Sequence, residues 1–589
     1  MKVFRKYIYE RRDVIIASVV TFLLCYALVM FNRIDLRDEM ANTFGIGVSV
    51  SSGRWTLWLI KRFIEAVMGN NMWSLPMLNG FFVMLHITMA ACLMVDSFGL
   101  VRRMSRILFP VLLVSFPGMI CMMGYTFTAP AYSLGILFAA LCGVLTVKWA
   151  ESGRNGRKRW FLFAGGIIFG ALSLGIYQSY ISFALVIMLT ALVRYTSGAS
   201  LKEAFLGMGK MLISLFGTMA LYLGIMKLFL VTREVELNSY KGMDSAFSLT
   251  PGRILERLGV SYKEFALPSR TDELNLFPFH SWWVYEGLLW LSLLMLVIFV
   301  IKKWKSLRNK PLLLLLAALF PPAMNVTYLL TDSGYYAMMF YPAVMVFGVM
   351  LAIWEMLSAA SPISEKLGQD VAASISEKPG QDVAASISEK TPRDAAPDAP
   401  KMPCLGESPD APEEPCRDET PAVPEAGTEK DRTAVRDGAF RKGIYVLALA
   451  GMCFIGFMSI RYANQLEMKG IVLKNQYTSF LTTLITRIQS TEGYTQESKV
   501  LLTNTQHVKT LDLWEEYTTV QLAPYVDNPL KYSKKNKKRM EFYLQQWCGF
   551  DAVYVTEDEL KDRKVLKKMP SFPEDGSIRV IDGIIVVKF

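Results

Sequence analysis

Cysteine, glycine and proline are too sparse in this chain for a disulfide scaffold or a collagen-like repeat: the 589 residues include 8 Cys, 40 Gly and 26 Pro. The cysteines show no spacing typical of a metal site or of a disulfide framework. Charged residues are also scarce, at 20%, whereas hydrophobic residues reach 52% and the mean hydropathy is +0.30. These proportions exclude a wholly disordered chain and argue against an ordinary soluble protein.

The apolar residues are grouped into runs of roughly 18–24 residues, the length that a helix needs to cross a bilayer. We therefore expect an all-α polytopic membrane protein with about 11 transmembrane helices. The expected spans lie near residues 14–31, 75–98, 107–124, 130–149, 160–177, 179–194, 210–231, 283–301, 311–330, 335–358 and 443–460.

Basic residues alternate with the expected spans and indicate their orientation. The N-terminal segment is basic, no small-residue cleavage site follows the first apolar run, and every second loop after it is basic. Because basic loops remain on the cytoplasmic side, we expect a cytoplasmic N-terminus and an extracytoplasmic C-terminal domain. The formal net charge of +11 then reflects membrane topology and predicts no nucleic-acid partner.

Composition divides the chain into four segments. Residues 1–358 form a transmembrane domain with all but the last expected span. Residues 359–440 are acidic, rich in Pro and Ala, and repeat the unit SISEKPGQDVAA with a 12-residue period. Such a stretch cannot bury enough apolar surface to offset its ordering entropy, so we expect a disordered cytoplasmic linker. Residues 441–460 form the last span, and residues 461–589 form a small extracytoplasmic α/β domain.

Local patterns outline the elements of this last domain. Lys499–Leu502 and Ala552–Val555 are typical of short strands, and Ile578–Lys588 predicts a hairpin that turns at Asp582-Gly583. Helical spacing of apolar residues predicts helices over 463–490, Met540–Trp547 and Glu559–Met569.

The densest polar cluster follows the first span directly and contains Asp35, Arg37, Asp38 and Glu39. Three and four residues of separation would place the carboxylates on one face of a helical turn. Clustered carboxylates raise one another's pKa and suit a general base or a divalent cation, although no ligand spacing demands a metal. The segment Trp55–Met68 follows with an amphipathic pattern typical of a helix in the membrane interface.

Several motifs lie in order at the expected outer ends of the spans. They are Asp38-Glu39, Gly45-Ile46-Gly47, Gly53-Arg54-Trp55, Gly124-Tyr125-Thr126-Phe127, Tyr177-Gln178-Ser179-Tyr180 and Tyr341-Pro342. Their order resembles that of the membrane glucosyltransferases of the Gtr type II class, which belong to the GT-C superfamily. The resemblance covers roughly residues 10–355 and implies a GT-C-like fold.

The resemblance also implies an activity, two substrates and a location. A glucosyl or other hexosyl group would move from a polyprenyl-phosphate carrier to a cell-surface glycan, on the outer face of a bacterial cytoplasmic membrane. Asp38 is then the expected general base, supported by Glu39 or Asp35, because transfer requires a carboxylate that accepts the proton of the acceptor hydroxyl. Arg54, with Arg37, is expected to bind the donor phosphate, since guanidinium binds phosphate in a bidentate manner.

Aromatic and polar residues of the other outer loops are expected to bind substrate. These residues are Tyr125, Tyr177, Gln178, His280 and Trp282. The sequence specifies no cofactor, and a divalent cation at the carboxylate cluster stays an open alternative.

Two other classes of protein fit the composition. A transporter or flippase would be expected to show inverted repeats and charged or broken spans near the bilayer midplane, whereas these spans are mostly uncharged and their polar clusters lie at the outer ends. A non-catalytic membrane scaffold would present the C-terminal domain and would keep its function when Asp38 is replaced by alanine.

Overall fold

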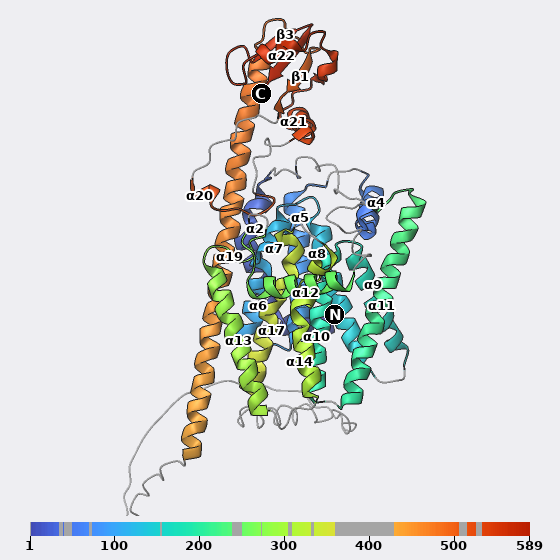
Figure 1. The fold of residues 1–589 in the computed structure, drawn as a ribbon, viewed down its shortest axis with the longest axis vertical. Coiled ribbons are helices and arrows are strands. Elements are labelled where there is room, and N and C mark those ends of the chain that lie inside the picture. The colour runs from blue at the N-terminus through green and yellow to red at the C-terminus, as the bar shows by residue number, and fades with distance from the viewer. Residues whose placement is uncertain are drawn as a thin grey trace, which may run out of the picture. The chain divides into compact units, whose positions relative to one another are not determined.

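The protein is described here by a computed structural model. The described residues are 2–34, 39, 50–69, 73–152, 156–198, 200–237, 250–271, 274–303, 309–331, 335–359, 429–505, 515–525 and 533–589. They are mostly helical, with one small sheet near the C-terminus (Figure 1). The chain forms two compact units, one of Met1–Leu357 with Tyr445–Phe589 and the other of Ser358–Ile444.

Seven helices in the described residues are long and apolar enough to cross a membrane. They are Arg12–Phe31 (α2), Pro76–Phe98 (α5), Ala129–Glu151 (α8), Gln178–Thr196 (η2 and most of α10), Leu201–Thr232 (α11), Ala337–Glu355 (η4 and most of α17) and Gly443–Gln489 (part of α19). The bent pair α6 (Arg103–Ser115) and α7 (Pro117–Met123) adds an eighth if it is one span. The structure thus confirms a polytopic helical protein, whereas eleven spans and a GT-C fold stay predictions.

The other expected spans coincide with helices that are short, broken or only partly described. These helices are α9 (Arg157–Leu174), α13 (Ser281–Lys303), α14 (Lys310–Ala318), α15 (Phe320–Met324) and α16 (Thr327–Leu330). In its described part, the transmembrane domain also contains the α-helices α1 (Lys2–Glu10), α4 (Trp55–Met68) and α12 (Pro251–Ala266). The amphipathic segment expected to form a helix is α4, which ends at Gly69 with φ 66°, a left-handed conformation that glycine adopts without strain.

A proline produces the bend of 46° between α6 and α7. Pro117 excludes a helical conformation at Phe116, where ψ is 141°, and it has no N–H to offer the carbonyl of Leu113. The Tyr341 hydroxyl donates to that carbonyl oxygen over 2.8 Å, and the Tyr26 hydroxyl donates to the next carbonyl, that of Val114, also over 2.8 Å. Each of these two carbonyl oxygens therefore accepts a side-chain hydrogen bond. Within a membrane span such a bond is needed, because no water is there to donate one.

The expected C-terminal α/β domain contains a four-stranded sheet in the order β2-β1-β4-β3. The strands are β1 (Lys499–Thr503), β2 (Val553–Tyr554), β3 (Ile578–Ile581) and β4 (Ile584–Lys588). β1 pairs parallel with β2 and β4, and β3 pairs antiparallel with β4. The predicted hairpin is confirmed, and its turn residues Asp582 and Gly583 have φ of 53° and 76°, as a type I′ turn requires.

Helices cover this sheet because its central strands are apolar on both faces. The end of α19 (Glu429–Gln489) and α21 (Ser533–Gln546) pack on one face, where Leu484 and Leu544 are fully buried with Val587. Short turns and α22 (Lys564–Lys568) cover the other. The predicted helices 463–490 and Met540–Trp547 are confirmed in type, whereas 559–569 is helical only over its last part and at the end of η6 (Glu557–Glu559).

A single helix, α19, connects the last expected span with the α/β domain (Figure 1). Its Lys474 ammonium donates to the Arg33 carbonyl oxygen over 2.6 Å, and the Glu467 carboxylate accepts from the Val29 N–H over 3.2 Å. These contacts fix α19 to the end of α2.

Most of the expected linker 359–440 lies outside the described residues, and α19 already begins at Glu429.

We expect Gly118→Ala to destabilise the fold. A methyl group there would lie 2.6 Å from Cβ and 2.7 Å from Cα of Tyr341, and a backbone atom cannot give way. The cost is about 1–3 kcal/mol, seen as a lower midpoint of thermal unfolding in detergent. Gly209→Ala is the matched control in α11, because nothing lies within 4 Å of its added methyl group. Equal midpoints for the two variants would contradict the close packing of α7 on η4.

Candidate functional site

Two of the sequence motifs meet where α4 begins and where the chain breaks between α9 and α10. The N–H groups of Thr56 and Leu57 donate to the carbonyl oxygen of Gly175 over 3.0 and 3.3 Å. An added Cβ at Gly175 would lie 2.2 Å from Oγ1 of Thr56 and 2.8 Å from the Trp55 ring. Glycine is therefore needed for this approach, which brings Gly53-Arg54-Trp55 against the segment that precedes Tyr177-Gln178.

Gln178 strengthens the same junction from the start of η2 (Gln178–Tyr180). Its Nε2 donates to the Ser52 carbonyl oxygen over 2.8 Å and to the Tyr222 hydroxyl over 3.1 Å. Tyr222 in turn donates to the Gly53 carbonyl oxygen over 3.3 Å. Gly53 has φ 72°, and an added Cβ would lie 2.5 Å from the Tyr222 oxygen. Gln178, expected to bind sugar, thus holds the loop that presents Arg54.

Tyrosines surround the half-buried Arg54 side chain. Its Nη1 donates to the Tyr132 hydroxyl over 3.2 Å, and its guanidinium carbon lies 4.8 Å from the centre of the Tyr177 ring. Tyr177 is buried, and its hydroxyl donates to that of Tyr336 over 3.3 Å. A guanidinium over an aromatic face is stabilised without a loss of its charge. This group of four residues, Arg54, Tyr132, Tyr177 and Tyr336, is called the Arg54 cluster.

Glu39 is buried, and its contacts connect the segment between α2 and α5 with the loop after α7. Its side chain is buried, and its carboxylate accepts from the Ser74 hydroxyl and, over 3.3 Å, from the Phe127 N–H. The Asn79 amide connects the same two segments, donating to the carbonyls of Trp73 over 2.7 Å and Thr126 over 2.9 Å. Both carboxylate oxygens of Glu39 therefore accept hydrogen bonds within the protein, an arrangement typical of an anchoring group.

The C-terminal domain reaches the loop that Glu39 holds. An added Cβ at Gly124 would lie 2.6 Å from Pro524 and 3.0 Å from the ring of Tyr525, so glycine is needed for this approach. Tyr525 is fully buried, and burial raises the pKa of its phenol, to which the carboxylates of Glu467 and Glu39 add. The phenol therefore stays neutral at physiological pH. Tyr125, expected to bind substrate, follows Gly124 directly and is half-buried.

The remaining predicted site residues lie elsewhere or are not described. His280 is exposed, with its ring 5.5 Å from that of Trp283, and the guanidinium of Arg270 lies 3.7 Å from the ring centre of Trp282. Asp35, Arg37 and Asp38 fall outside the described residues, so their predicted roles stay predictions. Within the described ranges, no group of three His, Cys, Asp or Glu side chains could hold a metal ion.

Sequence reasoning missed three tyrosines of this region. Tyr132 lies in the first turn of α8, where an aromatic residue at a span end is a visible signal. Tyr336 directly precedes η4, in a short connection before that helix. Tyr222 lies well inside the apolar helix α11, and no pattern in the sequence distinguishes it from a core residue.

Comparison with known proteins assigns the chain to a family. The family model described as glucosyl transferase GtrII matches residues 27–353, more than half of the chain. No curated protein and no solved structure matches it. The matched residues include Glu39, the Arg54 cluster and the loop at Gly124. This membrane protein is therefore a glycosyltransferase, and it belongs to the GtrII family of glucosyl transferases.

Proposed function

We propose that this glycosyltransferase moves a glucosyl or other hexosyl group from a polyprenyl-phosphate carrier to a cell-surface glycan at the outer face of the bacterial cytoplasmic membrane. The proposal depends above all on Arg54, a cation fixed by the Tyr132 hydroxyl and the Tyr177 ring at a junction of helix ends. A fixed guanidinium suits the departing lipid phosphate, because its fork of N–H groups matches two phosphate oxygens.

The surface beside Arg54 supports a lipid-linked donor. On α4, which begins directly after Arg54, three apolar side chains four residues apart are exposed, namely Leu59 at 40%, Phe63 at 69% and Val67 at 66%. A helix with such an apolar face lies in the membrane interface. A polyprenyl tail could therefore remain in lipid while its sugar phosphate is held at Arg54.

The positions of charged residues favour the outer face. Arg54 contacts Tyr132 in the first turn of α8, whereas Lys148 lies in the last turn of the same helix. Arg194 likewise lies toward the end of α10 (Ile181–Gly198), whose start follows Tyr177-Gln178. Since basic residues collect at the cytoplasmic ends of spans, the Arg54 cluster belongs to the opposite ends.

In the proposed reaction, the acceptor hydroxyl oxygen forms a bond to the anomeric carbon while the bond from that carbon to the phosphate oxygen breaks. Asp38 takes the proton of the acceptor hydroxyl, and the polyprenyl phosphate leaves with the electron pair. Arg54 stabilises the charge that develops on the phosphate. Glu39 supports this geometry by holding the first loop to Phe127 and Ser74. Tyr125, His280 and Trp282 are proposed to contact sugar.

The test of Arg54 is transfer of radiolabelled glucose from polyprenyl-phosphate-glucose to purified cell-envelope glycan. We expect Arg54→Gln to lower the rate by about 100-fold or more, the cost of losing one transition-state donor. Arg54→Lys should restore part of the rate, since it keeps the charge but not the fork. Arg62→Gln is the control, because this exposed arginine contacts Glu65 and the Trp58 ring, both on its own helix α4. Transfer by Arg54→Gln at the wild-type rate would refute the assignment.

The two carboxylates Asp38 and Glu39 should respond differently to removal of their charge. We expect Asp38→Asn to abolish transfer in the same assay while the thermal midpoint stays unchanged. Glu39→Gln should lower the midpoint, because its amide would turn a donor toward the Ser74 hydroxyl or the Phe127 N–H, at a cost of about 1–3 kcal/mol. A Glu39→Gln protein that melts normally but transfers no glucose would instead place Glu39 in the chemistry.

A further inference from the structure

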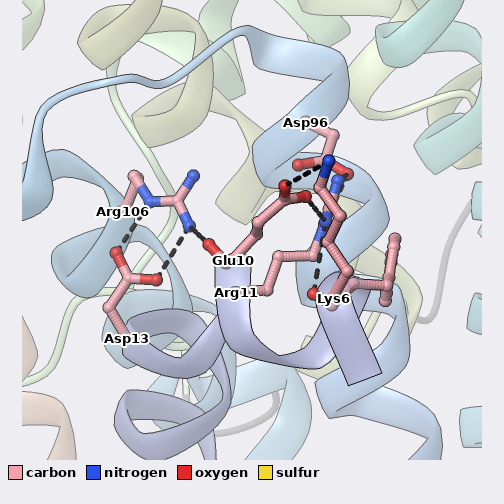
Figure 2. Close-up of polar contacts among 7 residues, drawn as sticks. Lys6, Glu10, Arg11, Asp13, Asp96 and Arg106 are labelled. Carbon is pink, nitrogen blue, oxygen red and sulfur yellow. Dashed lines mark hydrogen bonds and ion pairs between the residues drawn. The ribbon is translucent and has the colours of Figure 1, made fainter. Parts of the chain in front are cut away.

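At the helix ends opposite the Arg54 cluster, two arginines are neutralised by two aspartates (Figure 2). Arg106 forms a two-pronged ion pair with Asp13, over 2.7 and 2.8 Å, and also donates to the Glu10 carbonyl oxygen over 2.7 Å. Arg11 donates to one Asp96 oxygen from Nε and Nη2, over 2.8 and 2.7 Å. These pairs hold the start of α2 to the start of α6 and to the end of α5.

A pocket of about 470 Å³ opens beside the Asp13–Arg106 pair. Its walls come from the first turns of α2 and α6 and from the end of α1, and they include Arg12 and Arg103. Both arginines are exposed, and neither has a carboxylate within 4.0 Å among the described residues. The Arg12 guanidinium instead lies 4.6 Å from the centre of the Tyr9 ring.

The carboxylates that face this pocket are already compensated. Asp13 is paired with Arg106, and Glu10 lies 3.5 Å from Arg11 and 4.0 Å from Lys6. The start of α6 adds further positive potential, because the peptide dipoles of this 13-residue helix point their positive end toward Arg103. The pocket therefore has two cations and a helix dipole without a matching anion in the described structure.

Two apolar residues that line the pocket are open to the outside. Ile16 of α2 is 60% exposed, and Val101 is 81% exposed. Ile16 lies one turn further along the membrane-spanning helix than Arg12, on the side of the hydrocarbon. A soluble anion would gain nothing from these side chains, whereas the acyl chains of a lipid would cover them.

We propose that this pocket binds the phosphate of an anionic phospholipid headgroup, with Arg12 and Arg103 as its ligands and the acyl chains along Ile16 and Val101. Basic pockets between membrane helices favour such headgroups. The bound lipid bridges the starts of α2 and α6, beside the Asp13–Arg106 pair. This site is separate from sugar transfer and does not depend on the proposed reaction.

The experiment reconstitutes the full-length protein into nanodiscs that contain phosphatidylcholine with one fifth phosphatidylglycerol. After extraction into detergent, native mass spectrometry counts the retained phosphatidylglycerol. We expect wild-type protein to retain it in preference to phosphatidylcholine. Arg12→Gln and Arg103→Gln should each weaken retention about fivefold, which is the effect of one arginine near an anionic surface.

Arg157→Gln is the matched control, because Arg157 is also an exposed arginine in the first turn of a helix, α9, but lines no described pocket. Retention should be unchanged in this variant. Arg12→Lys and Arg103→Lys should retain phosphatidylglycerol close to the wild-type level, and they keep the test decisive if the glutamine variants fail to fold.

Three results would overturn the proposal. The first is equal retention by the wild-type protein and the Arg12→Gln/Arg103→Gln double variant. The second is an equal loss in Arg157→Gln, which would indicate diffuse attraction to basic helix ends. The third is displacement of phosphatidylglycerol by millimolar inorganic phosphate, which would indicate a site for a soluble anion.

Discussion

Pro117 cannot donate to the carbonyl of Leu113, and in a membrane interior no water can take its place. The Tyr341 hydroxyl satisfies that carbonyl, so the break between α6 and α7 costs no unpaired backbone group there. The break redirects α7 against η4, with Gly118 at the contact. Because α7 ends at Met123, its direction also decides where the loop of Tyr125 and Phe127 lies. The candidate site thus depends on a hydrogen bond deep in the transmembrane domain.

The second break, between α9 and α10, follows the same physical rule. The carbonyl of Gly175 accepts from two N–H groups at the start of α4, so two incomplete helix ends satisfy each other. Arg54 precedes these donors, and Tyr177 follows the acceptor. The guanidinium and the ring that contacts it are therefore brought together by backbone hydrogen bonds, and the cation is held in place before any substrate arrives.

The two ends of the membrane helices hold their arginines in different ways. The Tyr132 hydroxyl and the Tyr177 ring both contact the Arg54 guanidinium. Arg106 is held by the Asp13 carboxylate, which cancels its charge and fastens α2 to α6. A two-pronged ion pair of this kind fixes the geometry of the two helices that it joins.

The sequence by itself determined the properties that follow from near neighbours in the chain. The apolar runs predicted membrane helices, and Asp582-Gly583 predicted the turn of the hairpin, because length, hydropathy and turn chemistry are local. The tertiary structure alone decided that Gln178 holds the loop of Arg54, that Tyr222 joins it from α11, and that Pro524 packs against Gly124. These contacts join residues far apart in the sequence, and their distances depend on how whole helices pack, which no local pattern records.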